Sequence, residues 1–95
     1  MEEINELKER LLRSIEKLNA DASENLEDYK MIKLFSLKKL DSCYQLELSI
    51  GHFEKSFFTV NVKKDFWKIV DKFLENKRAE KILERFIHYT VLPLL

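Results

Sequence analysis

The fold is decided by the stretch Cys43-Tyr44-Gln45-Leu46-Glu47-Leu48-Ser49-Ile50, in which apolar and polar residues alternate without a break. Side chains of a strand point alternately to its two faces, so the pattern predicts a strand over residues 43–50 with one buried face. Gly51 follows, and a second alternating stretch predicts a strand over residues 55–62. The predicted buried face consists of Tyr44, Leu46, Leu48, Ile50, Phe58, Val60 and Val62.

Amphipathic helices are predicted on both sides of these strands. Apolar residues spaced by three and four predict a helix over residues 2–20. A similar spacing that starts at Phe66 predicts helical structure over residues 65–91, either as one long helix or broken into two near Asn76.

A third strand is predicted over residues 30–37, with apolar side chains on both of its faces. The connections between the strands are too short for parallel crossovers, so the strands must be antiparallel. We therefore predict one α+β domain over residues 1–95. Its sheet is a three-stranded antiparallel meander, flanked by an N-terminal helix and a long, or in the alternative broken, C-terminal helix.

The composition indicates the cellular compartment of the protein. The chain has one cysteine, Cys43, which excludes an internal disulfide framework and fits a reducing environment. Its acidic start predicts no signal peptide. No apolar run approaches the roughly 18 residues of a membrane span. We expect a cytoplasmic protein with no membrane partner.

Residues with reactive or metal-binding side chains are predicted to lie far apart. Cys43 and His52 stand at opposite ends of one strand, which separates them by about 30 Å. A single glycine leaves no Gly-rich phosphate loop. The sequence therefore predicts no catalytic residue, no metal site, no cofactor and no enzymatic activity.

Charge is unevenly distributed, although the formal net charge is zero. Residues 1–28 contain nine acidic and four basic residues, whereas residues 29–64 contain three acidic and seven basic ones. Either the acidic and basic segments neutralise each other within the fold or across a dimer, or the basic segment forms a binding face. Lysines can hold phosphates while neighbouring aromatic rings stack on bases. This alternative assigns nucleic-acid binding to Lys33, Lys55, Lys63 and Lys64.

The predicted order of a helix, three strands and a helix resembles the double-stranded-RNA-binding domain over roughly residues 2–75. Lys63 and Lys64 match the first two positions of the Lys-Lys-x-Ala-Lys pattern at the start of that family's second helix. Phe66 and Trp67 replace its Ala and Lys, and the Gly-Pro loop between its first two strands is missing. The resemblance concerns element order, and no function is transferred from it.

The chain has more apolar residues than one small core is expected to need, especially after the polar residues 75–81. Either the domain buries them all, or some form an interface. The predicted interface residues are Phe35, Phe57, Trp67, Ile82, Phe86, Leu92, Leu94 and Leu95. The leading prediction is a non-catalytic, homodimeric protein-binding module that also binds another protein. It would be an adaptor, a chaperone-like subunit or a small inhibitor of the kind that mobile elements encode.

Overall fold

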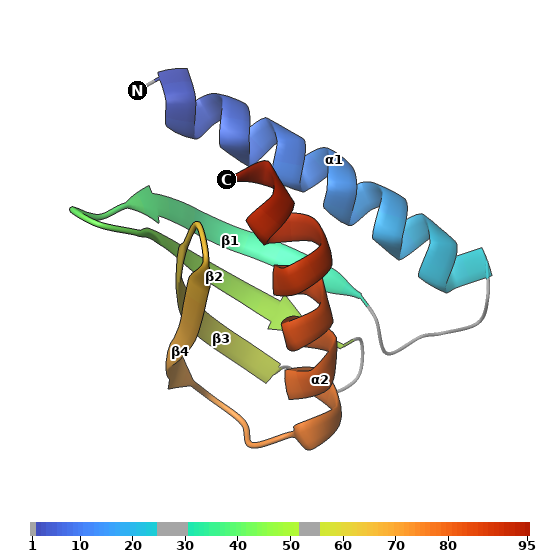
Figure 1. Cartoon of the computed structure of the whole chain (residues 1–95). Coiled ribbons are helices and arrows are strands. Elements are labelled where there is room, and N and C mark those ends of the chain that lie inside the picture. Colours follow the sequence, from blue (N-terminus) through green and yellow to red (C-terminus); the bar gives the residue numbers. More distant parts are fainter. Residues whose placement is uncertain (1, 25–30, 52–55) are drawn as a thin grey trace.

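The computed structural model describes residues 2–24, 31–51 and 56–95. Its elements are α1 (Glu2–Glu24), β1 (Ile32–Lys39), β2 (Tyr44–Ile50), β3 (Ser56–Lys63), β4 (Phe66–Lys72), α2 (Lys77–Phe86), the π-helix η2 (Ile87–Val91) and the 3-10 helix η3 (Leu92–Leu94). The four strands form one antiparallel sheet in the order β1-β2-β3-β4 (Figure 1). The α+β class and the two flanking helical segments are confirmed, whereas the prediction of three strands is wrong.

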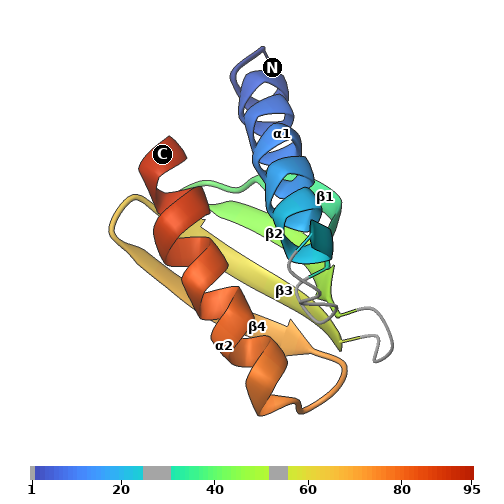
Figure 2. The ribbon, with the colours of Figure 1, turned by 90° about the vertical axis from the view of Figure 1, so that its right-hand side faces the viewer.

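Both helices pack on one face of the sheet. α1 lies next to β1, and α2 runs across the other strands (Figures 1 and 2). The buried cluster joins Leu11 of α1 and Leu83 of α2 to Leu46 and Val60 in the middle of the sheet. The predicted buried face is confirmed: six of its seven residues are buried, and Tyr44 is half-buried and packs against them.

The strand β4 occupies residues that were predicted to begin the second helix. Trp67 and Ile69 pack on the core, whereas Phe66 and Lys68 point to the opposite side. The apolar residues of this segment fit a helical period as well as an alternating one, and a short apolar run does not distinguish the two. Tertiary context selects the strand, because aromatic and β-branched residues suit a pleated surface and β4 pairs with the edge of β3.

A two-residue turn joins β3 to β4. Lys63 pairs with Phe66, so Lys64 and Asp65 form the turn between them. The two lysines therefore lie in a hairpin and not at the start of a helix. The fourth strand and this hairpin remove the resemblance in element order to the double-stranded-RNA-binding domain.

The predicted boundaries shift at several ends. α1 extends to Glu24, beyond its predicted end at residue 20, and β1 lies two residues later than predicted. Gly51 follows β2 with a φ of 104°, a value that glycine adopts without steric cost. The rest of the turn predicted after Gly51, and Lys55, lie outside the described residues.

A bulge explains why β1 looked apolar on both faces. Leu34 pairs with Leu48 but Ser36 pairs with Glu47, so Phe35 is an extra residue in β1. An extra residue reverses the alternation that follows it. Leu37 consequently packs on the core, as Leu34 does, although the two are an odd number of residues apart.

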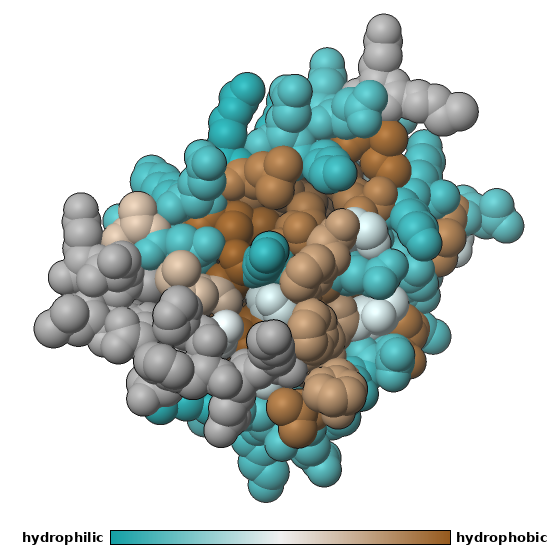
Figure 3. Space-filling view, turned by 180° about the vertical axis from the view of Figure 1, so that it is seen from behind, coloured by the Kyte–Doolittle hydropathy of each residue, from teal (hydrophilic) through white to brown (hydrophobic). Residues whose placement is uncertain are grey.

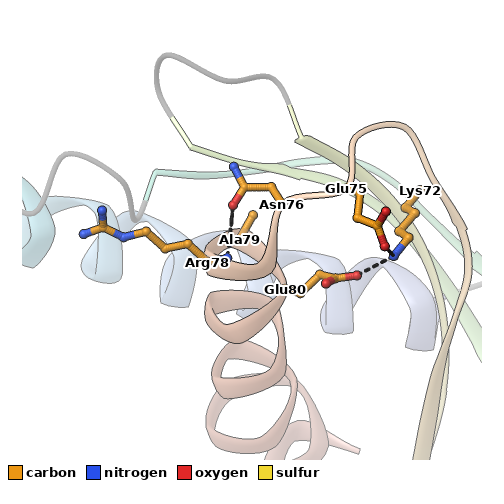
Figure 4. Close-up of polar contacts among 6 residues, drawn as sticks. All are labelled: Lys72, Glu75, Asn76, Arg78, Ala79 and Glu80. Carbon is orange, nitrogen blue, oxygen red and sulfur yellow. Dashed lines mark hydrogen bonds and ion pairs between the residues drawn. The ribbon is translucent and has the colours of Figure 1, made fainter.

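α2 begins at a side-chain cap on Asn76, the residue near which a break was predicted, but the segment before it is the strand β4 and not a first helix. The Asn76 Oδ1 atom accepts hydrogen bonds from the backbone N–H groups of Arg78 and Ala79, both over 3.1 Å (Figure 4). Asparagine is among the preferred N-cap residues because it satisfies donors that the first turn leaves free.

Ionic contacts hold the first turn of α2 to the end of β4. Lys72 Nζ lies 2.7 Å from a carboxylate oxygen of Glu80 and 3.5 Å from one of Glu75 (Figure 4). The hydrogen bond to Glu80 raises the pKa of Lys72 above its ordinary value, against some desolvation, and the negative charges of both glutamates add to the rise.

The C-terminal segment folds back onto α1. After α2 the chain widens into η2 and then tightens into η3, which contains Pro93. Both short helices contact α1. Val91 is buried, and Leu92, Leu94 and Leu95 pack partly buried against the core.

Asn19 of α1 closes part of the exposed edge of β1. Its Nδ2 donates to the Ile32 carbonyl over 3.0 Å, and its Oδ1 accepts from the Ile32 N–H over 2.9 Å. The amide thus pairs with Ile32 as the backbone of a neighbouring strand would. Edge strands present unpaired groups of this kind, and covering them is a common protection.

Replacing Asn19 with alanine is expected to lower the free energy of unfolding by about 1–3 kcal/mol, because two partly buried backbone groups lose their partners. Alanine also favours the helix, so Asn5→Ala, an exposed change on the same helix, is the matched control. Urea titration of both variants measures the difference. Equal midpoints would show that the contact to Ile32 adds no stability.

Candidate functional site

Three aromatic side chains form a row across the face of the sheet that is turned away from the helices, which we call the outer face. The rings of Phe35 on β1 and Phe57 on β3 have centroids 5.5 Å apart. Phe73, just after β4, packs edge-on against Phe57 at 6.1 Å. Phe35 is 48% exposed and Phe73 is 73% exposed, so the aromatic row is open to solvent.

Local backbone features position each ring. The bulge in β1 turns Phe35 to the outer face, and the alternation of β3 places Phe57 there, opposite the buried Phe58. The backbone N–H of Phe73 donates to the carbonyl of Phe57 over 2.9 Å, which extends the pairing past the end of β4. Seen from this side, hydrophobic side chains form a band through the middle of the molecule, with hydrophilic ones around it (Figure 3).

Lysines stand beside the exposed rings. The Nζ atom of Lys33 lies 5.5 Å from the ring centroid of Phe35, and that of Lys63 lies 5.5 Å from that of Phe66. Both distances are within the range of cation–π attraction. Of the other lysines predicted to bind nucleic acid, Lys64 lies in the β3–β4 turn and Lys55 is outside the described residues.

The carboxylate of Glu47, on the outer face, already has partners within the chain. Glu47 accepts a hydrogen bond from the hydroxyl of Ser36 over 2.8 Å and lies 3.8 Å from Lys38 Nζ. In the described part of the chain, Lys33, Lys63 and Lys68 make no ion pair. Asp71, which pairs with Thr59, also lies on this face. Among the described residues, the outer face therefore presents apolar rings with an excess of positive over negative charge around them.

The other predicted interface residues lie elsewhere. Trp67 points to the helix side of β4, where its Nε1 donates to His88 Nε2 over 3.3 Å and the two rings meet edge to face. Ile82 is half-buried, and Phe86 is buried in the core with 3% exposed, which leaves it little surface for a partner. Leu92, Leu94 and Leu95 pack on the core of their own chain.

The apolar residues after the polar gap are covered within a single chain. Leu83, Phe86 and Ile87 are all buried between α2, η2 and the rest of the core. The expectation that a second copy has to cover them is therefore wrong. Homodimerisation itself stays a prediction, without this support.

Sequence reasoning missed Phe66 and Phe73 as members of the outer face, because it placed them on the buried face of a helix. Both are exposed. The alternation of Trp67, Lys68 and Ile69, read together with Lys64 and Asp65 as a turn, could have indicated the strand and the outward position of Phe66. It could not have placed Phe73, because the register of β4 shifts between Ile69 and Asp71.

Other kinds of site were sought in the same residues. Across residues 2–24, 31–51 and 56–95, no three His, Cys, Asp or Glu side chains are grouped so that they could hold a metal ion. Among the helices of these segments, none combines the length and the apolar character needed to cross a membrane.

No protein-family model, curated protein or solved structure matches this chain. Function is therefore inferred from the outer face itself.

Proposed function

We propose that this chain is a non-catalytic protein-binding module that binds its partner through the outer face of its sheet. The supporting observation is that the helices cover one face, whose central residues are buried, while the other face keeps the aromatic row of Phe35, Phe57 and Phe73 open to solvent. Aromatic side chains carry much of the energy at protein interfaces. Contiguous exposed apolar surface is uncommon on monomers and marks interaction sites.

The charges around the row favour a partner other than a second copy. The described charges of the outer face are Lys33, Lys38, Lys63 and Lys68 against Glu47 and Asp71, so the face is positive in sum and two such faces packed together would repel each other. An acidic rim around an apolar centre would complement it instead. We therefore expect the partner protein, whether it is the target of an adaptor, the client of a chaperone or the target of an inhibitor, to carry an apolar patch with an acidic rim.

The face is small compared with stable protein interfaces. Strands about 4.8 Å apart and about seven residues long at about 3.3 Å each span on the order of 450 Å² for a sheet of this width. Stable interfaces bury about 800 Å² per partner. Binding through this face alone is therefore expected to be reversible and transient.

Site-specific photo-crosslinking tests the proposal in cells that produce the protein. A benzoylphenylalanine at position 73 is compared with one at position 89, because Phe73 and Tyr89 are both highly exposed aromatic residues but Tyr89 lies on the helix side. We expect a defined protein to be crosslinked from position 73 and not from position 89.

The purified partner then allows a quantitative comparison. Phe73→Ala should weaken binding at least tenfold, as loss of an interface anchor does, and Tyr89→Ala should leave the affinity unchanged. Unchanged melting temperatures would show that both variants are folded. Crosslinking from position 89 alone, or equal affinities of the two variants, would contradict the proposal.

Single-stranded nucleic acid is the second candidate ligand, and the specific observation in its favour is the position of Lys33 and Lys63 beside exposed rings. Stacking platforms with neighbouring cations bind single strands with little sequence preference and strong salt dependence. Fluorescence anisotropy with an oligothymidine probe would detect it. Binding that weakens with salt and with Phe35→Ala would favour this candidate, whereas no binding in low salt would remove it.

A further inference from the structure

A small apolar hollow lies between the two long helices, on the side of the molecule opposite the outer face. α1 contacts η2 and η3, the continuation of α2, and diverges from α2 itself (Figure 1). The space between them, which we call the helix wedge, has a volume of about 200 Å³. Its walls and floor are apolar and are formed by Leu18, Ile32, Ile82 and Phe86.

The other described lining residues are one cation, Arg85, and two residues with hydroxyl groups, Tyr89 and Thr90. Arg85 and Tyr89 both line the helix wedge, and both side chains are exposed. Within the described part of the chain, Arg85 makes no ion pair. Its other neighbours on α2 include Lys81 and Glu84, which line an adjacent hollow and offset each other in charge.

The size and chemistry together select one class of ligand. A dry cavity of about 150 Å³ is enough to hold benzene. The helix wedge thus has room for one ring or a short branched alkyl group. A single guanidinium presents a planar fork that matches a carboxylate. Among the described residues that line the wedge, Arg85 is the one cation, which disfavours doubly charged groups.

We propose that the helix wedge binds small organic acids that consist of an apolar tail about the size of a benzene ring and one carboxylate. The tail occupies the space between Leu18, Ile32 and Ile82, and the carboxylate reaches Arg85 and the hydroxyl of Tyr89 at the rim. The proposal is independent of the outer face, because no residue of the aromatic row lines the wedge.

Titration of the ¹⁵N-labelled full chain with 4-phenylbutyrate tests this assignment by NMR. We expect amide shifts confined to residues around the wedge, with a dissociation constant on the order of a millimolar, as suits a ligand of about twelve non-hydrogen atoms. The neutral analogue 4-phenylbutanamide should bind about three- to fivefold more weakly, since an exposed ion pair contributes modestly.

Two variants separate the charge from the apolar space. Arg85→Gln should weaken 4-phenylbutyrate about three- to fivefold and abolish the preference over the amide, whereas Arg10→Gln, on an exposed part of α1, should change neither. Thr90→Phe, which fills the wedge from η2, should abolish binding of both compounds. The ¹⁵N spectra of the free variants report whether each is folded.

Three outcomes would overturn the proposal. The first is no shift at 10 mM ligand. The second is equal binding of the acid and the amide to the unmodified chain. The third is binding that survives Thr90→Phe in a folded protein, which would place the ligand elsewhere.

Discussion

Replacing Leu46 with alanine is expected to lower the free energy of unfolding by about 2–5 kcal/mol, the range for truncating large aliphatic side chains in cores. Leu46 has no exposed surface, and it lies opposite Leu37 on one side and Val60 on the other. The side chain is thus enclosed between two neighbouring strands and the helices above them. The loss would be a large part of the 5–15 kcal/mol that stabilises a typical domain.

Ser49→Ala is the matched control, because Ser49 lies on the same strand but faces the outer side. It should change the free energy of unfolding by less than about 0.5 kcal/mol. Urea denaturation followed by circular dichroism measures both variants. Similar midpoints for the two would mean that the register of β2, and with it the whole buried face, is misplaced.

Truncation of the chain after Tyr89 is expected to destabilise it by several kcal/mol or to prevent folding. The removed segment includes Val91, which is buried, and three leucines that pack partly buried against the core. Full burial of one aliphatic side chain contributes about 1.5–3 kcal/mol. The segment also supplies η3, one of the contacts that hold α1 in place.

A truncation after Val91 serves as the graded control, since it keeps the buried valine and removes only residues 92–95, which include the partly buried leucines. Its melting temperature should lie between that of the full chain and that of the protein truncated after Tyr89. Mass in solution, measured on the same samples, shows whether an oligomer dissociates at the same time. If the protein truncated after Tyr89 melts at the same temperature as the full chain, this segment does not dock on α1.

The parts of the fold that could be predicted are those in which the spacing of apolar residues fits either a helix or a strand, but not both. The alternation of β2 and β3 admits no helical interpretation, and the stripe through Leu7, Leu11 and Ile15 admits no strand. Residues 66–74 fit both periods, so the sequence pattern alone could not decide between them. The capping residue Asn76 was the local signal that a helix begins there and not at Asp65.

The candidate site was predictable only in part, for a related reason. Phe57 follows from the alternation of β3, and its outward position was expected. Phe35 depends on a bulge, and bulges arise from the pairing of two strands, which the pattern of one strand does not encode. Phe73 joins the row because the register of β4 shifts between Ile69 and Asp71, which reverses the alternation that puts Trp67 and Ile69 on the core. Phe86 was predicted at an interface but is buried. Its burial depends on how α2 is oriented over the sheet, which the sequence pattern of the helix does not specify.

The amide of Asn19 has a consequence for how sheets of this protein could assemble. It occupies the outward N–H and C=O groups of Ile32, the residue at which β1 begins, and no other residue of that strand. A strand from another chain would have to displace this amide before it could pair along the whole length of β1. Edge-to-edge association of two copies through β1 is therefore disfavoured at the end of the strand where Asn19 lies.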